Sequence, residues 1–339
     1  MEVPSIFLNK ILSDAAKNNA NALFLNIGNK PIIKVNDNLV VLEEEEFITV
    51  DLLNKIIEST LTKDEYEKLS KEKEIKVVKV FGGSFRFRVA VFFQRSMLSV
   101  SFSYIQPAIR PLDELKLPPI MKSILKADSG LIVVAGPYGS GKTSTCASLV
   151  EEINKTQTKN IVTLEDPIEY VFVGKKSIIN QRQIGTDVAD LPSALDFMLE
   201  EDNDIAYISS HNESFENYNE KILELASGNS LVIMEMNTDS SIKVLQKIIN
   251  SSENSEATRF NLADVLLTVI VQKLVPIVGG GVALAVEVLI VNSAIKSLIR
   301  EGKIYQIESV IQTSRHEGMI SMDKAMEELY RTGQIKQSE

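Results

Sequence analysis

The chain has 339 residues, of which 24% are charged and 44% are hydrophobic, a composition typical of a soluble protein with room for two or three domains. Its net charge of -10 argues against a broad nucleic-acid-binding surface, but it does not exclude a local basic patch. The one cysteine, Cys146, excludes an intrachain disulfide. A buried, unreactive thiol explains this cysteine more simply than a redox function does.

Neither the N-terminus nor the most apolar stretch has the pattern of a membrane-directed segment. Residues 1–18 lack the basic stretch and apolar core of a signal peptide. Residues 262–291 are interrupted by charged side chains and by three glycines at 279–281, which predicts two buried elements and not a membrane span. These features indicate a cytoplasmic protein.

Residues 1–105 have the pattern of a small α/β domain with an antiparallel sheet. Helical periodicity comes first, strand-like runs follow, and two more helical patterns separate them from three further strand-like runs. The predicted helices are 3–19, 50–61 and 63–73, and the predicted strands are 22–28, 31–36, 38–42, 75–81, 85–93 and 98–105.

Residues 106–119 contain four prolines and no strong period, which predicts a linker. Strands and helices then alternate, as expected for a parallel sheet with helices on both faces. The rest is predicted to be mainly helical, interrupted by a strand pair around the glycines at 279–281. The predicted strands are 131–135, 160–164, 204–209 and 230–236, and the predicted helices are 142–154, 191–201, 218–228, 239–250, 257–272, 292–301, 304–313 and 321–332.

Residues 136–143, GPYGSGKT, match the pattern G-x-x-x-x-G-K-[ST] between an apolar run and a helical pattern, which is the context of a P-loop. The glycines allow backbone N–H groups to wrap nucleotide phosphates, and the helix N-terminus adds partial positive charge. We expect Lys142 to reach the β- and γ-phosphates and Thr143 to ligate Mg²⁺. The predicted ligands are therefore ATP and Mg²⁺, and the predicted binding residues are Gly136, Gly139, Ser140, Gly141, Lys142, Thr143 and Ser144.

Several stretches that follow the P-loop in order resemble one family. The chain is similar to the PilT branch of the type II/type IV secretion ATPases, motors that retract type IV pili. The segment TLEDPIEY is specific to that superfamily, and AIKSLIRE resembles a retraction-type signature. The matching stretches are TLEDPIEY (163–170), NQRQIG (180–185), LEEDNDIAYI (199–208), AIKSLIREGK (294–303) and IQTSRHEGM (311–319).

The resemblance implies an α/β fold with two domains: a PAS-like N-terminal domain over residues 1–105 and, after the linker at 106–119, a RecA-like P-loop ATPase domain over residues 120–339 with a helical C-terminal part. Family members are similar in forming ring hexamers that bind ATP between the two domains of each subunit. Arginines of the N-terminal domain help to hold the phosphates there, which implies such a role for Arg86 and Arg88. An ordinary solvated strand face is the alternative for both, and more so for Arg95.

The family's Asp-box carboxylate falls on Glu169. The resemblance implies that Glu169 positions Mg²⁺ through water or polarises the attacking water. A solvated loop carboxylate is the simpler alternative.

The Walker B region departs from the family pattern. There the apolar strand is followed by Gly-Glu, whereas here the strand IAYI is followed by Ser209 and Ser210. Ser210 thus stands at the position of the catalytic glutamate, and a hydroxyl cannot accept a proton from water as a carboxylate can. Glu165, Glu169 or His211 could compensate, although a loop histidine without a task is the simpler interpretation of His211.

Other family residues are also replaced. Two arginine positions fall on Glu200 and Asn212, and the paired histidines of the His box, thought to sense the γ-phosphate, fall on Ser230 and Asn237. Because the groups for hydrolysis and for sensing are lost together, the sequence predicts weak ATP turnover or none.

The resemblance therefore favours an ATP-binding motor subunit at the cytoplasmic face of the inner membrane, peripheral to it and not inserted. Its expected partners are copies of itself in a homo-hexamer, or a paralogous motor in a mixed ring, and the pilus inner-membrane platform protein. An active retraction ATPase with compensating residues and a non-catalytic scaffold of the pilus platform are the alternatives. A nucleic-acid translocase is opposed by the acidic charge.

Overall fold

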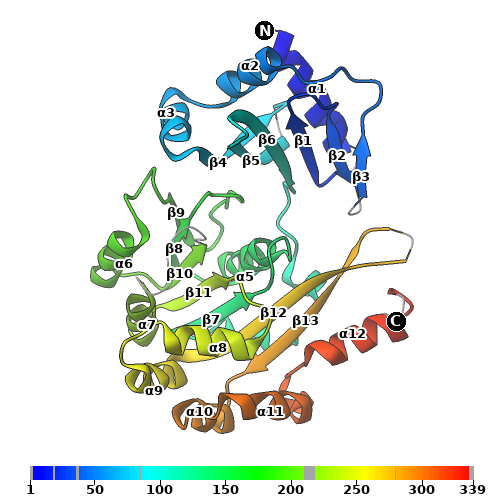
Figure 1. Cartoon of the computed structure of the whole chain (residues 1–339). Helices are drawn as coiled ribbons and strands as arrows, with labels where there is room; N and C mark the ends of the chain where they lie inside the picture. The colour runs from blue at the N-terminus through cyan, green and yellow to red at the C-terminus, as the bar shows by residue number, and fades with distance from the viewer. Residues whose placement is uncertain are drawn as a thin grey trace. The chain divides into compact units, whose positions relative to one another are not determined.

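The structure is a computed structural model that describes residues 3–17, 20–35, 38–83, 85–209, 218–278 and 280–335. The chain divides into two compact units, Met1–Ala108 and Ile109–Glu339. Each unit has its own β-sheet and its own helices (Figure 1).

The first unit is built on a six-stranded sheet with the order β3-β2-β1-β6-β5-β4, in which neighbouring strands pair antiparallel. One face of β5 is buried through Phe87, Val89 and Val91, while Arg86 and Arg88 alternate with them on the other face. The elements are α1 Val3–Lys17, β1 Ala22–Asn26, β2 Ile32–Val35, β3 Asn38–Val41, α2 Val50–Thr60, α3 Lys63–Glu72, β4 Glu74–Phe81, β5 Phe85–Gln94 and β6 Met97–Ile105.

The second unit is built on a seven-stranded sheet with the order β13-β12-β7-β11-β10-β8-β9. Its strands pair parallel except for the antiparallel hairpin of β12 and β13. The strands are β7 Gly130–Ala135, β8 Asn160–Glu165, β9 Ile178–Gln183, β10 Ile205–Ser209, β11 Leu231–Met236, β12 Leu266–Pro276 and β13 Val282–Ile290.

The helices of the second unit cover this sheet and extend beyond it. The helices α5, α7 and α8 pack against its strands, and α10 to α12 form the C-terminal part (Figure 1). The helices are η1 Leu112–Leu115, α4 Met121–Ile124, α5 Lys142–Thr156, α6 Leu191–Glu200, α7 Asn219–Ser227, α8 Ser241–Asn250, α9 Ser255–Val265, α10 Ser293–Arg300, η3 Ile304–Gln306, α11 Ile307–Thr313, η4 Arg315–Glu317 and α12 Met322–Arg331.

The three central strands β7, β11 and β10 are buried along their whole length. Their sequences GLIVVA, LVIMEM and IAYIS read as nearly continuous apolar runs, as expected for parallel strands with both faces covered. A glutamate, Glu235, is the one charged residue in these three strands.

The sequence prediction of a helix over 257–272 is wrong in its second half. Helix α9 ends at Val265, and β12 begins at Leu266. The segment LLTVIV is rich in β-branched residues and pairs with β7, so a long-range pairing decides its conformation. The edge strand β9 is absent from the sequence prediction because its residues, IINQRQ, are mostly polar.

The structure also describes the predicted linker and the length and apolar character of the helices. The proline-rich segment 106–119 contains η1, whose Leu112 and Leu115 are buried in the second unit. Among the described residues, none of the helices combines the length and the apolar character needed to cross a membrane.

Candidate nucleotide-binding site

The glycines shape the loop between β7 and α5. Gly139 and Gly141 have φ values of 75° and 88°, in the left-handed region that favours glycine. At Gly136, a Cβ atom would lie 2.4 Å from the Ser140 Oγ and 2.5 Å from the Gln272 carbonyl oxygen, so a larger residue would displace the loop. The Gln272 side chain donates from Nε2 to the Ser140 carbonyl at 2.6 Å, which ties the loop to β12.

The loop has features that fit a bound phosphate. The Ser140 hydroxyl is buried, and within the described part of the chain it has no hydrogen-bond partner. Buried hydroxyls are normally paired, so a phosphate oxygen at this place would satisfy it. Lys142 is 5% exposed and donates from Nζ to the carbonyl oxygens of Gly136 at 3.1 Å and Pro137 at 3.0 Å. Its ammonium therefore lies within the loop, at the N-terminus of α5, where the helix dipole also attracts anions.

Three hydroxyl groups surround the carboxylate of Glu235, which sequence reasoning missed. Thr143 Oγ1 donates to Glu235 Oε2 at 3.2 Å, and the Tyr207 hydroxyl donates to Oε1 at 2.7 Å. The third hydrogen bond comes from the Ser209 side chain. Burial raises the pKa of Glu235, while the hydrogen bond from Tyr207 and the charge of Lys142 oppose that rise. The one sequence signal for this group is a glutamate within the apolar run LVIMEM.

Glu165, at the end of β8, is a second buried carboxylate on the same edge of the sheet. It is 1% exposed, and it accepts from Thr163 Oγ1 at 2.6 Å and from Gln181 Nε2 at 3.0 Å. Burial raises its pKa to about 7, and its two hydrogen bonds only partly oppose this rise. These two partners belong to β8 and β9, so they hold the carboxylate within the sheet.

Glu169 lies in the loop after β8 and is half-buried. Its neighbour Tyr170 shares a 2.7 Å hydrogen bond with Ser144, between the tyrosine hydroxyl and the serine Oγ. This bond joins the loop of Glu169 to the first turn of α5. The structure thus brings Glu169 to the region of Ser144, whereas the role of Glu169 toward Mg²⁺ stays a prediction.

The replaced positions are spread over the second unit. Ser230 immediately precedes β11, away from the P-loop end, and its hydroxyl donates to the carbonyl oxygen of Asn203 at 2.6 Å. Asn237 follows the end of β11 and is exposed, and Glu200 is exposed at the end of α6. Ser210, His211 and Asn212 lie outside the described residues.

The arginines predicted to contact ATP belong to the first unit. Arg86 and Arg88 are half-buried on β5, and Arg95 is exposed in the turn between β5 and β6 with a φ of 49°. A contact between Arg86 or Arg88 and ATP stays a prediction. Cys146 is fully buried in α5, and burial raises the pKa of its thiol, which matches the unreactive role expected of it.

Mg²⁺ at this site would depend on the nucleotide. In the part of the chain that the structure describes, no group of three or more His, Cys, Asp or Glu side chains could hold a metal ion. Mg²⁺ usually binds through one or two protein oxygens together with substrate phosphates and water. The Thr143 hydroxyl beside the Glu235 carboxylate fits that arrangement.

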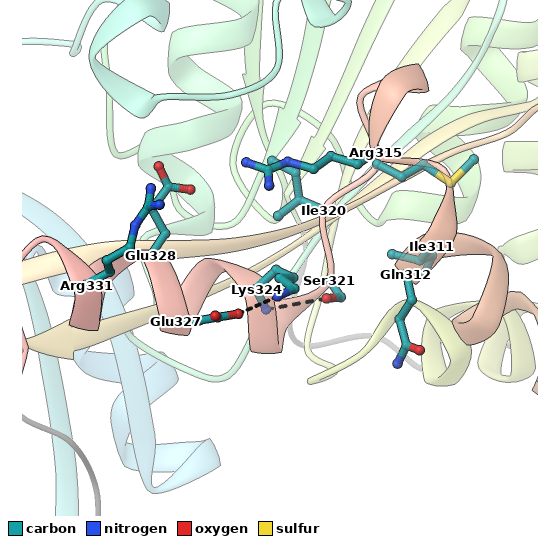
Figure 2. A pocket seen from close by; sticks show the side chains of 10 residues that line it. Ile311, Gln312, Arg315, Ile320, Ser321, Lys324, Glu327, Glu328 and Arg331 are labelled. Atoms are coloured by element: carbon teal, nitrogen blue, oxygen red, sulfur yellow. Dashed lines mark hydrogen bonds and ion pairs between the residues drawn. The ribbon is translucent and has the colours of Figure 1, made fainter.

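A separate pocket lies in the C-terminal helical part. It has a volume of about 250 Å³ and is lined by α11, η4 and α12 (Figure 2). Cationic and acidic side chains both line it, and Lys324 pairs there with Glu327 at 2.5 Å. None of its lining residues belongs to the P-loop or to β11, so it is not part of the nucleotide site.

The comparisons with known proteins agree with one another. Over residues 2–335 the chain matches the family of type II/IV secretion system proteins. It is 32% identical over 335 residues to the type IV pilus retractation ATPase PilT of Pseudomonas aeruginosa, covering 97% of this chain and 95% of that protein. It is 36% identical over 256 residues to a twitching motility protein of Neisseria gonorrhoeae, covering 74% of this chain and 67% of that protein.

A solved structure supports the same assignment. The crystal structure of the pilus retraction motor PilT with bound ADP superposes with a TM-score of 0.83 at 32% identity, covering 97% of this chain and 94% of that chain. This match confirms the predicted α/β fold of an N-terminal domain followed by a RecA-like ATPase domain. The chain therefore belongs to the type II/IV secretion system protein family and is PilT-like within it.

Proposed function

We propose that this chain is an ATP-binding, PilT-like motor subunit of a type IV pilus or related secretion machine, with weak or no ATP hydrolysis of its own. The observation that carries the proposal is the complete P-loop, with its enclosed Lys142 ammonium and a buried Ser140 hydroxyl that finds no partner among the described residues. The ADP bound to the similar PilT retraction motor supports a nucleotide as the ligand.

The weakness of hydrolysis follows from the end of β10. Ser209 and Ser210 stand where the family has Gly-Glu, so this strand supplies no carboxylate to orient the attacking water. Losing one contact to the transition state typically costs on the order of 10² to 10³ in rate. Ring assembly, as a homo-hexamer or with an active paralogous motor at the pilus platform, would place such a subunit in a working machine at the cytoplasmic face of the inner membrane.

A second candidate function is an active retraction ATPase with a compensating base. The pKa of Glu165, raised to about 7, favours it because a general base works best with a pKa near the working pH. Against it stand the burial of Glu165 and its two hydrogen bonds to Thr163 and Gln181, which occupy the carboxylate. A non-catalytic scaffold that regulates the pilus platform, with ATP as a structural ligand, differs from the leading proposal because it is not a subunit of the motor.

One pair of measurements tests the proposal. Calorimetry should detect binding of ATP and ADP to the full chain, and the steady-state ATPase rate at saturating MgATP should lie well below about one per second, the low end of typical enzymes. Turnover at or above that rate would favour the active ATPase. The absence of any affinity for ATP or ADP would contradict nucleotide binding itself.

A further inference from the structure

The buried carboxylate of Glu235 has no role in the nucleotide binding or hydrolysis predicted from the sequence. It is 5% exposed and lies in a strand whose other residues are apolar. Burying a carboxylate is costly unless it is paired and hydrogen-bonded. Hydroxyl groups from β10 and α5 donate hydrogen bonds to Glu235 and so offset this cost. Such donors stabilise the charged form of the carboxylate.

The sheet brings Glu235 directly to the P-loop. Strand β11 lies between β7 and β10, and Glu235 is opposite Val134, close to the end of β7 from which the P-loop leaves. The backbone N–H of Gly136 donates to the Met236 carbonyl at 3.2 Å, so the end of β11 and the start of the loop are joined. Tyr207 reaches Glu235 from the neighbouring strand at 2.7 Å.

The hydrogen bond between Thr143 and Glu235 has a consequence for a cation. A hydroxyl has one proton and two acceptor lone pairs. Because Thr143 donates its proton to Glu235 Oε2, its lone pairs are left for a cation on the nucleotide side. In P-loop NTPases Mg²⁺ is held by the P-loop Ser/Thr together with an acidic residue of the Walker B strand. Here the acid that contacts the P-loop threonine comes from β11.

We propose that Glu235 is the carboxylate that holds the Mg²⁺ of the bound nucleotide beside Thr143, in place of an acid on β10. The inference rests on the proposed nucleotide binding and adds the residue responsible for the metal. Mg²⁺ supplies charge neutralisation of the phosphates when it is bound. Glu235 supplies a negative charge behind Thr143, and it fixes the direction of that hydroxyl.

The other acidic residues of this edge do not fit the role as well. The described hydrogen bonds of Glu165 come from Thr163 and Gln181, on β8 and β9, whereas Glu235 accepts one from the P-loop threonine. Glu169 is tied to the P-loop helix through its neighbour Tyr170. Its half-buried position suits contact with water better than contact with Thr143.

The enclosure of Glu235 also separates metal binding from hydrolysis. Because Thr143, Tyr207 and Ser209 donate hydrogen bonds to its carboxylate, Glu235 would act on the metal through Thr143 and through its charge, and it would not replace the acid that activates water. Metal binding therefore persists in a subunit whose hydrolysis is weak.

A purely structural carboxylate is the alternative, and Glu235→Gln separates the two roles. Glutamine retains an oxygen that accepts hydrogen bonds but removes the negative charge. The matched control is Glu151→Gln. Glu151 is also a buried, hydrogen-bonded glutamate, but it lies on α5. Glu151 is eight residues from Thr143, about 12 Å along the helix axis.

The experiment measures two affinities for the full-length chain and both variants. The first is the affinity for ADP in the presence of EDTA. The second is the affinity of the protein–ADP complex for Mn²⁺, a paramagnetic substitute for Mg²⁺, followed by electron paramagnetic resonance. We expect Glu235→Gln to weaken Mn²⁺ binding by about 10- to 100-fold, the usual cost of losing a group that supports a metal site. ADP affinity in EDTA should be unchanged, and Glu151→Gln should match the unaltered chain in both measurements.

Each other outcome overturns the inference. Mn²⁺ affinity in Glu235→Gln equal to that of the unaltered chain would leave nucleotide binding intact and remove Glu235 from the metal site. Loss of ADP affinity in EDTA would assign Glu235 a structural role. If the unaltered chain bound no ADP, the proposed function would fail together with this inference. Should Glu235→Gln not fold, Glu235→Asp retains the charge but moves it back by one methylene, and a smaller loss of Mn²⁺ affinity is expected.

Discussion

Strands β10 and β11 are neighbours that end at the same edge of one sheet, yet they present different chemistry there. The described part of β10 ends in Ser209, which points a hydroxyl at its neighbour's carboxylate. Strand β11 carries Glu235, which contacts the P-loop threonine. On the proposed function, this difference predicts that binding of the phosphates and metal is separable from activation of water, since the P-loop motif is intact while the family's Walker B glutamate position is a serine.

The largest effect should come from Lys142, because both nucleotide binding and hydrolysis depend on its expected contact with the phosphates. Lys142→Ala removes the ammonium that lies within the P-loop, and with it the charge-assisted contacts that we expect it to make to the phosphates. We expect ATP affinity to fall on the order of 10³-fold, which corresponds to about 4 kcal/mol. Calorimetry in EDTA measures this loss without the metal. An affinity within about tenfold of the unaltered chain would mean that the nucleotide binds elsewhere.

The next effect is a pH dependence of the free energy of unfolding caused by Glu165, whose carboxylate is hydrogen-bonded to β8 and β9. The pKa of Glu165 is about 7 in the folded chain, against an ordinary value of 4.5. Below pH 4.5 the group is protonated in both states. Between pH 4.5 and 7 only the unfolded chain loses this proton, so the free energy of unfolding falls as the pH rises. Above pH 7 the full loss is about 3 kcal/mol.

Glu165→Gln removes this titration. Urea unfolding should therefore give nearly equal stabilities for the variant and the unaltered chain at about pH 4.5, and a variant that is more stable by about 3 kcal/mol at about pH 8. Parallel pH dependences of the two proteins would contradict the raised pKa.

The next prediction concerns Ser210, which follows β10 in the sequence and stands at the family's Walker B glutamate position. Ser210→Glu should raise the ATPase rate by about tenfold, because the loss of one transition-state contact is repaired while the others remain missing. Adding Asn237→His and Asn212→Arg should raise the rate further, and the effects should be non-additive because these groups act as a unit. No gain from the triple variant would show that the departures from the family pattern do not limit turnover.

The parts of this site that the sequence predicts are those with a local cause. The P-loop is recognisable because Gly139 and Gly141 need left-handed backbone, which the motif encodes within a short segment. The start of β12 resembles helix in the sequence because its pairing with β7 is long-range. Glu235 escapes prediction because its partners are far apart in the chain: Thr143 is 92 residues away, and Tyr207 is 28 residues away. No local sequence pattern encodes a contact between residues so far apart in the chain.

The smallest effect should come from the opposite end of β11. Ser230 occupies a position that the family resemblance links to sensing of the γ-phosphate, yet its hydroxyl donates to the carbonyl oxygen of Asn203. Ser230 precedes Glu235 by five residues, and five residues of a strand span about 16 Å. Ser230→Ala should therefore lower the free energy of unfolding by about 1 kcal/mol through the lost hydrogen bond and leave ATP affinity unchanged. Urea unfolding and calorimetry on the same preparation measure both quantities. A change of ATP affinity larger than that caused by Glu151→Gln would mean that Ser230 influences the nucleotide site. The two ends of β11 would then be coupled.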